Sequence, residues 1–128
     1  MPESRNLLTF LSDLFKIVCV VPIVEYQRLT RSLHDAVAWA RRSGSAGKTR
    51  SPVDRRGLRR SIAAIDRFVP GGANCVRRAL LEIRLDGAAA RESFFAGFKS
   101  GGGPKSGHAW LESDPRGAGS SFDATTVI

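Results

Sequence analysis

The chain has 128 residues, of which 42% are hydrophobic and 25% are charged, a composition typical of one globular domain and not of a disordered tail. The net charge of +8 favours anionic partners, but no base-stacking aromatic pattern or nucleic-acid-binding module accompanies the arginines, so nucleic-acid binding is not expected. With two cysteines and no signal peptide, the sequence argues against a disulfide framework and predicts a reducing, cytoplasmic compartment.

The first third of the chain is predicted to be helical. Residues 5–21 are dense in Leu, Phe, Ile and Val, and we expect Pro22 to end or kink this helix because proline lacks an amide donor. The most apolar run, 14–24, contains Lys16 and Pro22 and is too short for a membrane span. We therefore expect a buried or partner-facing helix with at most a membrane-surface contact. In 25–42, apolar residues recur every three or four positions and predict a second helix.

A segment of small, polar and basic residues, 42–52, is predicted to be a flexible linker. It divides a single domain, 1–128, into a helical N-terminal part, 1–41, and the remainder, 53–128. A third helix is predicted next, because an apolar stripe lies opposite a strongly basic side. The stripe is Leu58, Ile62, Ile65 and Val69, and the basic side is Arg55, Arg56, Arg59, Arg60 and Arg67. We expect the basic side to be solvated or to dock a partner.

A fourth helix is predicted from Cys75 to about Arg84. The Pro-Gly-Gly segment 70–72 ends the preceding helix, and Asn74 stands where an N-cap belongs. Cys75 then lies in the first turn, where free backbone amides and the helix dipole favour thiolate over thiol. Cys75 is therefore the candidate nucleophile; the alternative is a buried structural cysteine, since free cysteines are often buried.

The remainder changes character, with short aromatic or β-branched segments between glycine-rich loops. The segments 93–98, 107–112 and 121–128 predict antiparallel strands. The predicted fold class is therefore α+β, with a helical N-terminal half followed by a helix packed on a small antiparallel sheet.

Two residues of this sheet are candidates to assist Cys75. His108 shares a strand face with Trp110, two residues on, and histidine suits the role of general base. Asp123 opens the last strand, and a hairpin is expected to bring it beside His108, where it would orient the ring. Asp114 is the alternative third residue, although Asp-Pro is more typical of a turn.

The remaining cysteine and histidine do not form a second site. Cys19 lies in the apolar run IVCVV and is expected to be a core residue, whereas His34 lies among charged residues and is expected to be exposed. Because the two cysteines and two histidines do not form close pairs, no metal site is expected, and no cofactor either.

The order of NCVRRALLEIRLDGAAA, GHAWLE and FDATT resembles the transglutaminase-like, papain-like cysteine peptidase superfamily over roughly residues 54–128. Within that superfamily it resembles the lasso-peptide maturation protease, the B protein in its stand-alone protease form. The resemblance implies a Cys75–His108–Asp123 triad that removes the leader from a ribosomally made precursor. It also implies two protein partners, a separate leader-recognition protein and the ATP-dependent lasso cyclase.

Two other functions remain open at this point. A transglutaminase-like acyl transferase would use the same three residues and differ only in whether an amine or water enters the thioester. A non-catalytic binding or scaffold protein would keep Cys75 as a structural residue and use its arginines on an acidic partner.

Overall fold

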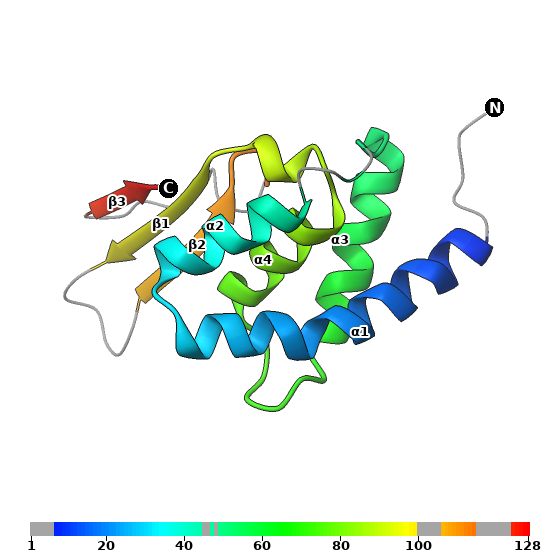
Figure 1. The fold of residues 1–128 in the computed structure, drawn as a ribbon, viewed down its shortest axis with the longest axis horizontal. Coiled ribbons are helices and arrows are strands. Elements are labelled where there is room, and N and C mark those ends of the chain that lie inside the picture. Colours follow the sequence, from blue (N-terminus) through cyan, green and yellow to red (C-terminus); the bar gives the residue numbers. More distant parts are fainter. Residues whose placement is uncertain (1–6, 45–46, 48, 100–105, 115–123) are drawn as a thin grey trace.

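The computed structural model describes residues 7–44, 47, 49–99, 106–114 and 124–128 (Figure 1). The described part is an α+β fold in which helices precede a small antiparallel sheet, as predicted. The helices are α1 (Leu7–Thr30), α2 (Leu33–Gly44), α3 (Pro52–Asp66) and α4 (Cys75–Leu85), followed by the 3-10 turn η1 (Ala89–Arg91). The strands are β1 (Phe94–Lys99), β2 (Ser106–Leu111) and β3 (Ala124–Val127).

Helix α1 continues through Pro22, so of the two outcomes expected there, an end or a kink, the helix end is excluded. Proline removes one helical hydrogen bond, but the helix packs into the core on both sides of it through Ile17 and Val24, which are fully buried. Pro22 itself lies on the exposed side. The second helix, expected from residue 25, begins only at Leu33.

The connection between α2 and α3 is attached to the body of the protein through Arg50. Its guanidinium contacts the carboxylates of Asp13 and Asp54, each at 3.1 Å, and its Nε donates to the carbonyl of Leu85. Helix α3 then starts with Ser51 as its N-cap, accepting from the Asp54 amide. The flexibility expected for 42–52 stays a prediction.

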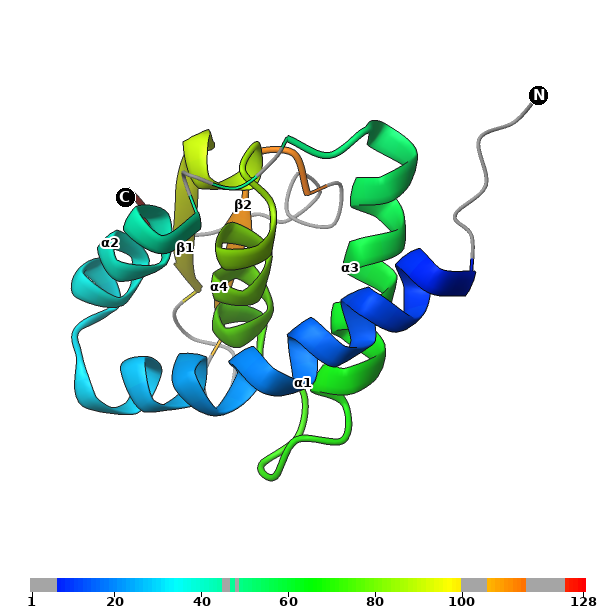
Figure 2. The same cartoon turned by 45° about the vertical axis from the view of Figure 1, so that its right-hand side comes forward.

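Helix α4 lies at the centre of the molecule, as Figure 2 shows, with α2 on one side, α3 on the other and α1 crossing below. Its residues Leu80, Leu81 and Ile83 are fully buried, which makes it the core helix. The predicted N-cap is confirmed, because the Asn74 side chain accepts from the amide of Arg77.

The three strands are antiparallel, and their order is β2-β1-β3. One face of the sheet packs into the core through paired residues such as Phe94 with Leu111 and Ala96 with Ala109, all buried. The last strand pairs with β1 and not with β2, so the expected hairpin beside the histidine strand is wrong. Central β1 is more apolar, and β3 completes its second hydrogen-bonding edge.

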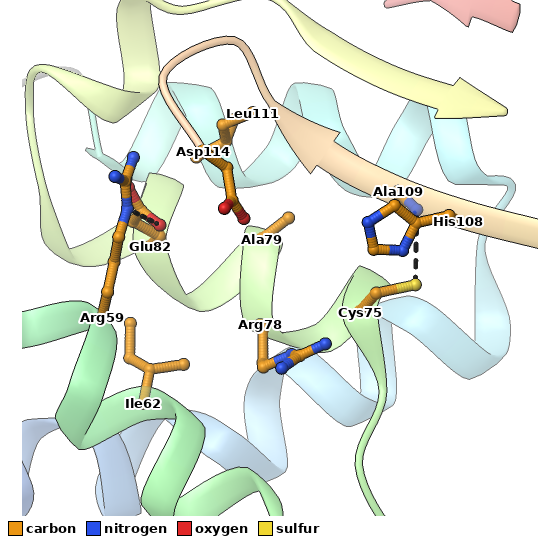
Figure 3. Close-up of a pocket in the computed structure, with 10 residues that line it drawn as sticks. All are labelled: Arg59, Ile62, Cys75, Arg78, Ala79, Glu82, His108, Ala109, Leu111 and Asp114. Carbon is orange, nitrogen blue, oxygen red and sulfur yellow. Dashed lines mark hydrogen bonds and ion pairs between the residues drawn. The ribbon is translucent and has the colours of Figure 1, made fainter. Parts of the chain in front are cut away.

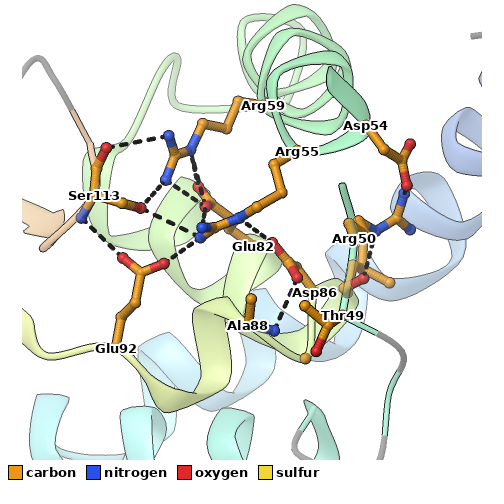
Figure 4. A network of polar contacts seen from close by, with 12 residues as sticks. Thr49, Arg50, Asp54, Arg55, Arg59, Glu82, Asp86, Ala88, Glu92 and Ser113 are labelled. Atoms are coloured by element: carbon orange, nitrogen blue, oxygen red, sulfur yellow. Dashed lines mark hydrogen bonds and ion pairs between the residues drawn. The ribbon is translucent and has the colours of Figure 1, made fainter. Parts of the chain in front are cut away.

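The predicted basic side of α3 is only partly a surface, because two of its arginines bind buried acids (Figure 4). Arg59 donates to both carboxylate oxygens of Glu82, at 3.0 and 2.9 Å. Arg55 bonds Asp86 at 2.7 Å and also contacts Glu92. These contacts join α3 to α4 and to the start of the sheet, so both arginines compensate acids within the fold. Docking of a partner on the basic side stays a prediction.

Candidate active site

Cys75 is the first residue of α4, and its backbone is held by the cap. The Asn74 side-chain oxygen accepts from the Arg77 amide at 2.9 Å, and the Asn74 carbonyl accepts from the Arg78 amide. Among the described residues, none accepts from the amides of Cys75 or Val76. These two free N–H groups at a helix start favour negative charge nearby.

A buried ion pair fixes the loop that leads into this helix start. Asp66, at the end of α3, is fully buried and bonds Arg77 Nε at 2.5 Å, while its other carboxylate oxygen accepts from the Asn74 amide at 2.8 Å. Arg77 is 1% exposed and also donates to the Gly72 carbonyl. The sequence analysis missed this pair; its only signal was an acid at the end of a mostly basic helix, eight residues before the cap.

The sulfur of Cys75 lies at the free edge of the sheet. β2 pairs only with β1 among the described strands, and the Ala109 amide on its other side donates to Cys75 Sγ at 3.3 Å (Figure 3). This hydrogen bond fixes the position of the sulfur against the edge of β2. The sulfur of Cys75 therefore lies both at the start of α4 and against a backbone amide at the edge of β2.

His108 lies beside this sulfur, as Figure 3 shows, and lines the same pocket. Its ring stacks on Trp110 with a centroid distance of 5.4 Å and an interplanar angle of 19°, which confirms that the two side chains share a face. Trp110 in turn stacks on Phe95 of β1 at 5.7 Å. This aromatic row limits the rotation of the imidazole and holds it toward Cys75.

The pocket has a volume of about 50 Å³, enough for a small group rather than a whole side chain. It is lined by Arg59, Ile62, Cys75, Arg78, Ala79, Glu82, His108, Ala109, Leu111 and Asp114. Burial raises the pKa of Glu82, and the hydrogen bonds from Arg59 oppose this only in part. Arg78, one turn after Cys75, has a buried Nε that makes no hydrogen bond but lies 3.6 Å from the Asp66 carboxylate. The site is thus a narrow cleft with charged groups of both signs around the sulfur.

The family model of the transglutaminase-like superfamily matches residues 17–126, most of the chain. The chain belongs to the transglutaminase-like superfamily. Comparison with curated proteins and with solved structures gives no match. The transglutaminase-like superfamily includes cysteine peptidases and acyltransferases, and its members generally use cysteine-type catalysis.

The third residue of a transglutaminase-like triad is the part of the prediction that the described residues leave open. Asp123 lies outside them. Asp114 lines the pocket, but in Figure 3 its carboxylate lies near Ala79, while the imidazole of His108 lies near Cys75. In the sheet, Gly97 of β1 is in register with His108 on one side and with Thr125 on the other. At the position of His108, the residue of β1 that separates β2 from β3 is therefore a glycine, which places no side chain between the two outer strands.

The two residues set aside by the sequence analysis differ in outcome. His34 is exposed on α2, as predicted. Cys19 was expected in the core, and this is wrong, because it is exposed on the outer side of α1. The apolar run around it does not lie fully inside the protein, since α1 buries only one side. Any thiol measurement on Cys75 must therefore first remove Cys19.

Proposed function

We propose that this protein is a cysteine peptidase that removes the leader peptide from a ribosomally made lasso-peptide precursor. The observation that carries the proposal is the capped helix start at Cys75, whose sulfur accepts from the Ala109 amide in a pocket shared with His108. Membership of a superfamily that contains cysteine peptidases supports the chemistry. The specific substrate rests on the likeness of the Cys75 helix and the GHAWLE strand to the lasso-peptide protease.

In the proposed acylation step, the Cys75 thiolate attacks the scissile carbonyl carbon, and the π electrons of the C=O bond move to the carbonyl oxygen. The free N–H groups of Cys75 and Val76 are placed to stabilise that oxyanion. When the C–N bond breaks, imidazolium at His108 gives its proton to the departing amine, which is the new N-terminus of the core peptide. The leader stays on Cys75 as a thioester.

In the second step, His108 takes a proton from water, and the resulting hydroxide attacks the thioester carbonyl. The tetrahedral intermediate then expels the Cys75 thiolate and releases the leader as a carboxylic acid, which restores the thiolate beside the His108 imidazolium. The freed core peptide then passes to the lasso cyclase, while a separate leader-recognition protein presents the precursor. We propose the lasso cyclase and the leader-recognition protein as its two partners, and the cytoplasm as its location.

For the third residue we propose Asp123, which keeps the Cys, His, Asp chain order, and retain Asp114 as the alternative. A carboxylate that orients imidazole also stabilises its charged form. Replacing the true partner by Asn is therefore expected to lower kcat by roughly 10³-fold or more while leaving KM little changed. Asp123→Asn and Asp114→Asn are compared directly for this reason.

The test is mass spectrometry of the precursor peptide incubated with this protein and the leader-recognition protein. A Cys19→Ala variant serves as the matched control, since it removes the other thiol far from the pocket. We expect a single cleavage by the wild type and by Cys19→Ala, and none by Cys75→Ala or His108→Ala. The leader product should be a free acid; an amide would indicate acyl transfer instead.

Two outcomes would overturn the proposal. Cleavage by Cys75→Ala would exclude this sulfur as the nucleophile. Failure of the wild type to cleave a precursor bound to its recognition protein would exclude leader removal. In that second case, rapid alkylation of Cys75 by iodoacetamide below pH 7 would still indicate a catalytic thiol with another substrate, whereas slow alkylation would favour a binding protein.

A further inference from the structure

Helix α1 carries a continuous apolar row on the side that faces away from the protein. Its members recur at spacings of three and four, which places them on one helical face over about 30 Å. We call this row the outer stripe: Leu8, Leu11, Phe15, Val18, Pro22, Tyr26 and Leu29. Phe15 is 72% exposed, Tyr26 63% and Leu29 69%. No charged residue interrupts the stripe, and such a patch marks an interaction surface.

The opposite side of α1 is attached to the protein by charges as well as by apolar packing. Asp13 is buried and bonds Arg50 at 3.1 Å, and Glu25 bonds Arg77 at 3.1 Å. By length and composition α1 is able to cross a membrane, yet spanning one would separate these pairs and expose the core. The helix is therefore suited to lie along a surface.

Exposed positive charge surrounds the stripe. Lys16 is on α1 itself, Arg31 follows its last turn, and Arg60 of α3 lines an apolar groove with Leu7 and Phe10. None of these three cations has an ion-pair partner within the described part of the chain. Both acids of α1, by contrast, are neutralised. Of the charged residues on α1 and in the turn that follows it, those without an ion-pair partner among the described residues are therefore both positive, Lys16 and Arg31.

We propose that the outer stripe binds an anionic membrane surface, with α1 parallel to it. The apolar side chains would enter the boundary between head groups and acyl chains, and Lys16, Arg31 and Arg60 would contact lipid phosphates. Pro22 has no N–H to donate to the Val18 carbonyl, so that carbonyl needs water as its hydrogen-bond partner. The boundary between head groups and acyl chains is hydrated and supplies it. A second copy of this chain is disfavoured because the same cations would face one another.

The test is co-sedimentation of the full chain with vesicles of phosphatidylcholine, with and without phosphatidylglycerol. Wild type should bind the anionic vesicles and lose binding as salt is raised. Phe15→Ser/Leu29→Ser should weaken that binding by roughly tenfold or more, because it removes two inserted side chains. Lys16→Ala and Arg31→Ala should each weaken it about fivefold, and His34→Ala on α2 should not change it.

Each contrary result overturns the proposal. The first is that the wild type does not bind anionic vesicles, and the second is that the Phe15→Ser/Leu29→Ser variant binds them as well as the wild type. The third is that alkaline carbonate does not extract the wild type from the vesicles, which would indicate a spanning helix. Concentration-dependent dimerisation that the variant abolishes, without vesicle binding, would assign the stripe to a second copy. Val18→Ser/Tyr26→Ser provides an independent variant should the first fail to fold.

Discussion

Asn74 serves both the stability and the chemistry of α4, because its side chain caps the helix that Cys75 begins. Its oxygen satisfies the Arg77 amide, which would otherwise remain unpaired. We predict that Asn74→Ala lowers the free energy of unfolding by about 1 kcal/mol, as N-cap removal does elsewhere. The same change should slow alkylation of Cys75, since a frayed first turn presents weaker positive potential to the thiolate.

Both effects are measured in a Cys19→Ala background, by urea denaturation and by the rate of iodoacetamide labelling against pH. Asn74→Ser is the conservative control, because serine also caps helices. It should keep the labelling profile of the parent. If Asn74→Ala loses stability but labels as fast as the parent at every pH, the cap has no influence on the thiol.

At the scale of single residues, the sequence was most informative where the physics is local. The cap at Asn74, the place of Cys75 in the first turn of α4 and the shared face of His108 and Trp110 all follow from neighbours in the chain, and all are confirmed. The role of Cys75 as nucleophile stays a prediction. The burial of Cys19 was misjudged because an apolar run does not reveal how much of its circumference the rest of the fold covers.

Among the elements, the Asp66–Arg77 pair is the fully buried ion pair between the end of α3 and the start of α4. Asp66 lies at the end of one helix, and Arg77 lies in the first turn of the next. We predict that Asp66→Asn destabilises the fold by about 3 kcal/mol or more, because the buried Arg77 loses its fully buried carboxylate partner and keeps only the partly exposed Glu25. The proposed peptidase activity should fall as well, since the backbone amide of Asn74 loses the charged oxygen to which it donates.

Chemical denaturation and the cleavage assay, both under conditions where the variant is folded, provide the measurement. Glu112→Gln is the matched control, an acid-to-amide change at an exposed position at the end of β2. It should change stability by less than about 0.5 kcal/mol. An Asp66→Asn variant as stable as Glu112→Gln would mean that the pair contributes nothing.

The number and type of elements were predictable from the sequence, but their partners were not. Amphipathic spacing is enough to locate α3 and α4, and alternating aromatic segments are enough to locate the strands. The pairing of β3 with β1, the continuation of α1 through Pro22 and the inward turn of Arg55 depend on contacts between distant segments. Such contacts leave no periodic signal in the chain.

For the molecule as a whole, the arginines behind the net charge of +8 fall into two groups with different roles. Arg55, Arg59 and Arg77 compensate acids inside the protein, whereas Arg31 and Arg60 remain exposed beside α1. The internal set joins α1, α3 and α4 by ion pairs in addition to their apolar packing, and the exposed set supplies the field for the proposed anionic partner. A uniform count of basic residues cannot separate these two roles.

The internal acids predict how stability depends on pH. Burial alone would raise the pKa of Glu92, but hydrogen bonds from Ser113 and Arg55 outweigh it and leave the pKa below its ordinary value of 4.5. Below pH 4.5 the unfolded chain then binds this proton before the folded one does, so Glu92 contributes stability that is lost as the pH falls. For Glu82, burial dominates and the pKa is raised, which gives the opposite sign. Ionised Glu82 costs stability above its folded pKa, and acidification relieves that cost.

We therefore predict that the two glutamates change the acid sensitivity in opposite directions. Urea denaturation between about pH 7 and pH 3.5 should show a shallower loss of stability for Glu92→Gln than for wild type, because a titrating group with a lowered pKa is removed. Glu82→Gln should show a steeper loss, because the compensating gain on protonation disappears. Both variants break an arginine contact at pH 7, so the comparison uses the slopes and not the absolute free energies. Parallel slopes for all three proteins would show that neither carboxylate titrates differently in the folded and unfolded states.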